Sequence, residues 1–264
     1  DKARLIIQRL LPQLLYAFSE TPDPAKTITR FDTFLSGLPA GVQLFSLLEA
    51  NPSLCGLLAR ILGQAPALAN TLAATPALWD YVLEPDFFEP VSIGSELSQV
   101  LDPQLARARD YEDTLNICRR FAREVRFRIG VQIIEACADI RESGAALSYL
   151  ADGLIERLTV AATAEFESKH GRIAGSGLAV MALGQLGGRS LTFSSDLDLM
   201  FLYTPGTGQP SDGARSLMPS AYYSRLVQVI ITALTTLTAE GALFEVDTRL
   251  RPSGSQGPIV VTTD

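Results

Sequence analysis

Residues 184–203, GQLGGRSLTFSSDLDLMFLY, combine a glycine-rich turn, a serine pair and an Asp-x-Asp motif at the start of an apolar run. The run at 197–203 is so apolar, and so clearly bounded by turn residues, that it predicts a buried central strand. Successive strand side chains point to opposite faces, so Asp196 and Asp198 share one face. Two carboxylates side by side at the mouth of a buried strand repel each other and resist desolvation, which predicts a cation between them.

The cation that best fits this pair is a hard divalent ion. Mg²⁺ binds one or two carboxylates together with substrate phosphates and keeps water molecules as its other ligands. The motif therefore indicates phosphoryl or nucleotidyl chemistry, with Asp196 and Asp198 as metal ligands.

The segment before the motif supplies a turn suited to phosphate binding. Residues 177–183, GLAVMAL, form a second short apolar run and predict a strand that ends at a cluster of glycines. Glycines let the backbone adopt positive φ and bring bare amide N–H groups close to a phosphate, and serine hydroxyls add donors. The predicted phosphate-binding residues are Gly184, Gly187, Gly188, Ser194 and Ser195. The spacing of these glycines does not match a dinucleotide-binding fingerprint.

A third acid is expected from a neighbouring strand, and residues 242–250, ALFEVDTRL, provide Asp247. If this strand is regular, Asp247, Arg249 and Arg251 share one face. A carboxylate beside two guanidinium groups suits the binding of a metal ion and a triphosphate, because arginine spreads over phosphate oxygens.

Each motif alone also fits a purely structural role. An isolated Asp-x-Asp motif is typical of a solvated strand end, and a Gly-Gly pair is typical of a turn. The succession of strand, glycine turn, acidic strand, long helix and Asp-x-Arg-x-Arg strand favours a functional site.

Three segments resemble the nucleotidyltransferase core of bacterial glutamine synthetase adenylyltransferases, within the DNA polymerase β-like superfamily. They are LGQLGG at 183–188, SDLDL at 195–199 and VDTRLRPSG at 246–254. Residues 34–48 also resemble the helical lead-in to the C-terminal half of that enzyme, so the resemblance covers nearly the whole chain. It implies an α+β fold, with a mostly helical lead-in domain at 1–140 and a small mixed-sheet core at 141–264 that is truncated at its C-terminus.

The resemblance implies transfer of AMP from ATP to a tyrosine of glutamine synthetase, with release of pyrophosphate. Asp196 and Asp198 would hold two Mg²⁺ ions, and Asp247 would complete the site and take the tyrosine proton. The glycine turn and Ser195 would hold the triphosphate, and the two arginines after Asp247 would offset charge on the leaving group. In the family, glutamine and the PII signal protein regulate this half of the enzyme.

Other functions stay open. The family also contains an adenylyl-removing half with the same acids, although the Pro-Ser-Gly at 252–254 and the lead-in favour the adding half. A nucleotide-sensing or docking module without turnover is a second alternative, and a helical scaffold with an incidental acid pair is a third. Gln185 and Ser190 stand where the family pattern has Lys and Glu, and loss of that Lys predicts weaker phosphate binding.

The composition narrows the class of protein. The chain has 264 residues and a net charge of −7, which argues against nucleic acid as a partner. Its three cysteines, Cys55, Cys118 and Cys137, are widely spaced without a Cys-x-x-Cys pair, so we expect buried thiols in a reducing cytoplasm. The sequence has no apolar run of transmembrane length and no initiator Met, so we expect no membrane partner and a piece of a larger protein.

Helical periodicity covers most of the remaining chain. We expect long helices at 102–140, at 145–170 and from about 216 to Glu240, the last with Leu237 facing inward. The first of them carries a cluster of arginines, which favours a solvated, ion-paired face over the alternative of contact with phosphate or an acidic partner. The cluster consists of Arg119, Arg120, Arg123, Arg126 and Arg128. A last strand is expected at 257–262.

Overall fold

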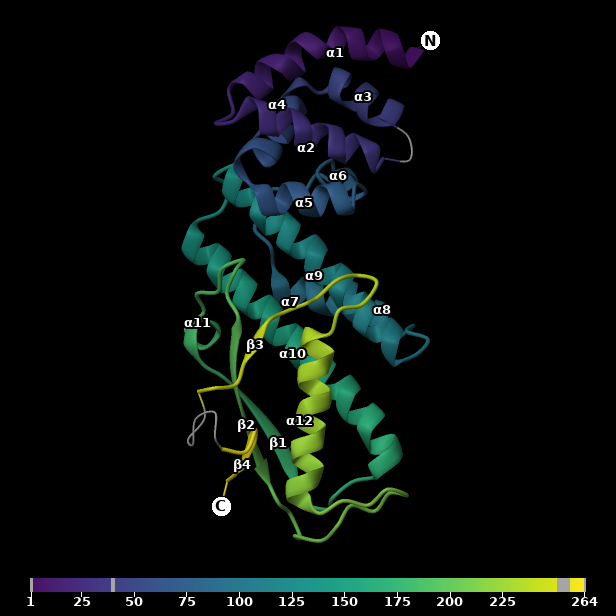
Figure 1. The fold of residues 1–264 in the computed structure, drawn as a ribbon, viewed down its shortest axis with the longest axis vertical. Coiled ribbons are helices and arrows are strands. Elements are labelled where there is room, and N and C mark those ends of the chain that lie inside the picture. The colour runs from purple at the N-terminus through teal and green to yellow at the C-terminus, as the bar shows by residue number, and fades with distance from the viewer. Residues whose placement is uncertain (1, 39–40, 251–256, 264) are drawn as a thin grey trace. The chain divides into compact units, whose positions relative to one another are not determined.

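The computed structural model describes residues 2–38, 41–250 and 257–263 (Figure 1). These residues form helices and a small mixed sheet of four strands, which confirms the predicted α+β class. They divide into two compact units. Unit 1 comprises Asp1–Pro90 and Arg123–Asp139, and unit 2 comprises Val91–Ala122 and Ile140–Asp264. The division into functional domains at residue 140 stays a prediction.

The regular elements in the described residues of unit 1 are all helices, joined by turns. Prolines open several of its helices, because the first helical N–H has no intrahelical acceptor and proline lacks that N–H. The helices are α1 (Lys2–Ser19), α2 (Pro24–Ser36), α3 (Gly41–Ala50), α4 (Pro52–Gln64), α5 (Pro66–Ala74), α6 (Leu78–Tyr81) and the second part of α9 (Tyr111–Ile134). Trp79, Phe34 and Phe127 are among its largest fully buried side chains. These three side chains belong to the apolar core of this unit.

Unit 2 contains the sheet and the helices that pack on it. Among these helices, α12 lies alongside α10 (Figure 1). The helical elements are α7 (Ile93–Glu96), a π-helical turn at Leu97–Leu101, α8 (Asp102–Leu105), the first part of α9, α10 (Ile140–His170), α11 (Gly184–Gly187) and α12 (Pro219–Thr235). In the part of the chain that the structure describes, no helix is long and apolar enough to cross a membrane.

Strand β2 (Leu197–Thr204) is the centre of the sheet, as the sequence predicts. It pairs antiparallel with β1 (Gly177–Ala182) along one edge. Its other edge pairs in parallel with two short strands, β3 (Val246–Asp247) and β4 (Val260–Thr262). Leu197, Leu199 and Phe201 have no exposed surface, so one face of β2 is the core of the sheet.

Two of the predicted helices have different limits. The predicted helix at 102–140 is interrupted, and α9 starts anew where the Asp110 side chain accepts the Asp113 N–H at 2.8 Å. The helix predicted from residue 145 begins at Ile140 instead, with Gly144 inside it. A Cβ at Gly144 would lie 3.3 Å from Leu191 O, so this glycine lets α10 approach another backbone segment closely.

Helix α12 ends at Thr235, which is earlier than predicted, and Leu237 is 78% exposed rather than inward-facing. The prediction of a solvated arginine face is wrong for Arg119, which is only 2% exposed. Its guanidinium binds carbonyl oxygens at the end of α12, and these contacts account for both errors. Sequence periodicity reports the spacing of apolar residues, and it carries no information about a cation that is buried against helix-end carbonyls.

Replacing Phe201 by alanine should destabilise unit 2 by about 3–5 kcal/mol, because it removes a fully buried ring from the central strand. Met181→Ala on β1 is the control, and it should cost less than about 1 kcal/mol because Met181 is 40% exposed. Urea denaturation measures both values. Equal losses in the two variants would contradict β2 as the core of the sheet.

Candidate functional site

The separate segments that carry the predicted acids pair with each other at the Leu197 end of β2. In the parallel pairing of β2 with β3, Leu197 is the register partner of Val246 and Asp198 is the register partner of Asp247. The Leu197 N–H donates to Glu245 O at 2.9 Å, which fixes this register. Asp196 directly precedes the strand.

The negative charges of Asp196 and Asp247 act on the Asp198 carboxylate. The pKa of Asp198 is raised, first by burial and then by the negative charges of Asp196 and Asp247. Arg249 acts in the opposite direction on Asp198. This end of β2 is therefore a position where a cation is favoured.

Asp247 is held by Arg249. The Arg249 N–H donates to Asp247 Oδ1 at 2.7 Å and its Nε donates to Asp247 Oδ2 at 2.8 Å, and the pKa of Asp247 is lowered mainly by these bonds. The carboxylate thus closes a turn on the backbone two residues later, which ends strand pairing. The prediction of a regular strand through 242–250 is therefore wrong, because β3 has only two residues. Arg251 lies outside the described residues.

The glycine turn packs directly against the acidic strand. Gly184 has φ +52°, and a Cβ at this position would overlap Asp198 Oδ2. A Cβ at Gly187 would lie 2.7 Å from Ala182 O. Glycine is needed at both positions, for positive φ at the first and for close backbone approach at the second.

The prediction of unpaired amide N–H groups in this turn is wrong for Gly187 and Gly188. Gly187 N–H donates to Leu183 O at 2.8 Å and Gly188 N–H donates to Gly184 O at 3.0 Å, because residues 184–187 close a single helical turn, α11. In this conformation, the two amides are occupied within the turn.

The serines lie next to the turn. Ser195 Oγ donates to Gln185 Oε1 and accepts the Thr192 N–H at 3.0 Å. Ser194 Oγ lies 3.4 Å from Thr192 Oγ1. Gln185, which departs from the expected lysine, is therefore joined to a predicted site residue.

Helix α10 anchors the turn through residues that the sequence analysis did not identify. Arg189 pairs with Asp152, and its guanidinium carbon lies 4.6 Å from the centre of the Tyr149 ring. The Leu191 N–H donates to Ser148 Oγ at 3.2 Å. These partners are remote in sequence and lie in an ordinary helical pattern, so no local signal marks them.

The donor set suits a hard cation, although the carboxylates do not converge in this conformation. Mg²⁺ prefers carboxylate oxygens, and Asp196, Asp198 and Asp247 supply them. Over the described ranges, no group of three or more His, Cys, Asp or Glu side chains is close enough to hold a metal ion. In this conformation, Asp247 is paired with Arg249.

The small mixed sheet, the glycine turn and the acids at one end of the central strand are the arrangement that the sequence predicts for a nucleotidyltransferase. Comparison with known proteins agrees with this class. A family model described as glutamate-ammonia ligase adenylyltransferase matches residues 55–264. The chain belongs to this family.

The similar proteins are bacterial and longer. A protein of Brucella suis named bifunctional glutamine synthetase adenylyltransferase/adenylyl-removing enzyme is 44% identical over 259 residues, which cover 98% of this chain and 26% of that protein. A protein of the same name from Mesorhizobium japonicum is 44% identical over 264 residues, with 100% and 27% covered. The chain therefore spans about a quarter of the length of these relatives.

Gly184→Ala should destabilise the chain by about 1–3 kcal/mol, because alanine disfavours the positive φ and its Cβ displaces the Asp198 carboxylate. Gly94→Ala is the control, since a Cβ there meets no atom within 4 Å. Denaturant titration measures the free energy of unfolding of each variant. A loss at Gly184 no larger than at Gly94 would contradict the tight packing of the turn on Asp198.

Asp198→Asn should raise the melting temperature at neutral pH in metal-free buffer by a few degrees. The raised pKa of Asp198 means that the folded state disfavours the ionised carboxylate. The wild type therefore loses folding stability at neutral pH, where Asp198 is ionised. This loss vanishes as the pH falls below 3.8, the ordinary pKa of an aspartate. The advantage of the variant should therefore shrink on acidification. Calorimetry across this range measures it, with Glu156→Gln as the control at an acid whose side chain is 77% exposed. A variant that is less stable than the wild type at neutral pH would contradict the repulsion among the acids.

Proposed function

We propose that the chain carries the site that transfers AMP from ATP to a tyrosine of glutamine synthetase, with Mg²⁺ as cofactor. The observation that supports this most directly is the register pairing of Asp198 with Asp247 at the end of β2 that also bears Asp196. Membership in an adenylyltransferase family supports the reaction class, and the names of the relatives support the protein substrate.

Asp196, Asp198 and Asp247 would hold two Mg²⁺ ions. When bound, these ions would neutralise the triphosphate and favour ionisation of the attacking tyrosine hydroxyl. The raised pKa of Asp198 supports the assignment, because neighbouring negative charges would be relieved by a cation.

Arg249 would change partners when ATP binds. Its guanidinium is paired with Asp247, and a triphosphate would offer it a more highly charged acceptor. Transfer of Arg249 to the phosphates would release the Asp247 carboxylate, which could then bind a cation and accept the tyrosine proton. Arg251 would act on the same leaving group.

The glycine turn would position the triphosphate beside Asp198. Because Gly187 and Gly188 use their amides inside α11, binding through these amides requires the turn to open. Ser194, Ser195 and Gly184 would complete this side of the site. The bond between Ser195 and Gln185 links the position of the missing lysine to the phosphate-binding side.

The adding reaction is favoured over adenylyl removal by the sequence at 252–254, which lies outside the described residues, and by the lead-in at 34–48. In either reaction the same acids would act. We further propose that glutamine and the PII signal protein regulate the adding reaction, that the protein works in the cytoplasm, and that its site takes a free nucleotide rather than a nucleic acid.

Asp196→Asn and Asp247→Asn should each reduce AMP incorporation into glutamine synthetase by about 100-fold or more, because each removes a carboxylate that offsets charge in the transition state. Labelled ATP with purified glutamine synthetase measures incorporation, and phosphate-dependent loss of the label measures the removing reaction. Glu156→Gln should retain wild-type rates, because this exposed acid lies on α10 outside the site.

Wild-type rates in either aspartate variant would reject the assignment of the acids. Magnesium-dependent ATP binding without incorporation or removal of AMP would instead support a nucleotide-sensing module. Absence of metal-dependent nucleotide binding would leave only a scaffold with an incidental acid pair.

A further inference from the structure

Arg119 on α9 carries a charge that is buried in unit 2, since its exposed fraction is only 2%. Its guanidinium donates to four backbone carbonyls. The acceptors are Leu115 O, Ala233 O, Thr236 O and Gly241 O, at 3.0, 3.0, 2.7 and 3.0 Å respectively. All are carbonyl oxygens rather than carboxylates, so Arg119 serves as a backbone clamp and not as half of an ion pair.

Three of these carbonyls belong to the last turn of α12, at Ala233, and to the segment that follows it, at Thr236 and Gly241. Helix α12 ends at Thr235, and its last carbonyls have no intrahelical donors. The buried cation supplies donors to them and also interacts favourably with the negative end of the helix dipole. Burial lowers the pKa of Arg119, but a guanidinium remains charged at any ordinary pH.

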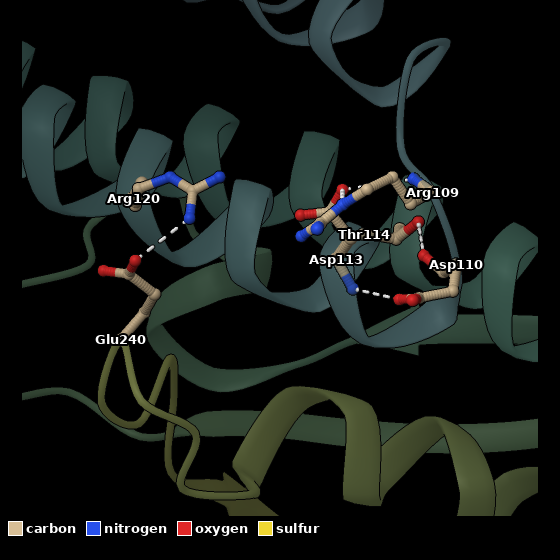
Figure 2. Close-up of polar contacts among 6 residues, drawn as sticks. All are labelled: Arg109, Asp110, Asp113, Thr114, Arg120 and Glu240. Carbon is tan, nitrogen blue, oxygen red and sulfur yellow. Dashed lines mark hydrogen bonds and ion pairs between the residues drawn. The ribbon is translucent and has the colours of Figure 1, made fainter.

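A second contact holds the turn that follows. Thr238 and Gly241 exchange backbone hydrogen bonds of 3.2 and 3.0 Å and close a tight turn. Arg120, the residue next to Arg119, binds the tip of this turn, because its Nη1 donates to Glu240 Oε1 at 2.9 Å (Figure 2). Helix α9 therefore contacts both the start and the tip of the connection.

This connection leads directly to the third acid. Beyond the turn, the Phe244 N–H donates to Leu234 O at 3.1 Å, and Glu245 O accepts the Leu197 N–H. Asp247 follows as the register partner of Asp198. Because β3 has only two residues, its own ladder holds it weakly, and its position depends on the segment before it.

We propose that Arg119 and Arg120 are positioning residues for the acidic site, because they hold the end of α12 and the turn after it and thereby place Asp247 beside Asp198. The inference rests on the proposed function, since it concerns the same carboxylates. Neither arginine touches those carboxylates, so both act through the backbone of residues 236–247.

The Arg120–Glu240 pair provides the sharper test, because its side chains are 40% and 23% exposed and its loss should leave the chain folded. Arg120→Glu and Glu240→Arg should each speed amide hydrogen exchange at residues 242–247 and weaken Mn²⁺–ATP binding, both by at least about threefold. The double variant restores the opposite charges in reversed order. It should return both quantities to within about twofold of the wild type.

Arg109→Glu is the matched control for charge reversal, because Arg109 lies just before α9. Arg109 pairs with Asp113 at 3.1 Å at the start of α9 and does not reach the turn that holds Glu240 (Figure 2). It should change neither exchange at 242–247 nor Mn²⁺–ATP binding. Circular dichroism at the assay temperature should confirm that every variant is folded.

Arg119→Lys tests the buried clamp itself. Lysine keeps the charge but lacks the planar fork that reaches several carbonyls, so exchange at 242–247 should rise further than in Arg120→Glu. If this variant does not fold, the Arg120 and Glu240 variants still decide the question.

Unchanged exchange and binding in both single variants of the pair would overturn the proposal, and so would a double variant that fails to restore them. A wild-type chain that does not bind Mn²⁺–ATP would count against the proposed function alone. Hydrogen exchange would then still show whether α9 holds the segment that carries Asp247.

Discussion

The parallel contact between β2 and β3 is the constraint on which the candidate site depends. It joins two residues of each strand and brings Asp247 beside Asp198 from a remote segment of the chain. So short a ladder contributes little by itself. The segment after α12 must therefore be held in position for β3 to pair in the correct register. Hydrogen bonds from Arg119 and from the backbone hold residues 233–245 in this way.

The charges at this contact are unevenly compensated. Burial and two neighbouring carboxylates raise the pKa of Asp198, whereas Arg249 lowers the pKa of Asp247. Arg249 therefore offsets only part of the charge repulsion at Asp198, whereas it is hydrogen-bonded directly to Asp247. The glycine turn adds to this arrangement, since the absence of a side chain at Gly184 makes room for the Asp198 carboxylate. This arrangement supports the proposed binding of a cation together with an anionic nucleotide.

The sequence predicts the central elements well because their signals are local. An apolar run bounded by turns predicts β2, and alternation places Asp196 and Asp198 on one face. The failures come from tertiary contacts that local patterns do not contain. The end of α12 depends on Arg119, which periodicity places on a solvated face, and the brevity of β3 follows from the bonds between Asp247 and Arg249. The anchoring of the glycine turn on α10 through Asp152 is equally remote in sequence.

The most direct test of the shared acidic site is a double-mutant cycle for Mn²⁺–ATP binding with Asp198→Asn and Asp247→Asn. If both carboxylates bind one metal–nucleotide complex, either single change should remove most of the affinity, and the second change should cost little more. The two losses would then be strongly non-additive. Free-energy losses that add within about 0.5 kcal/mol would show independent sites and contradict this account.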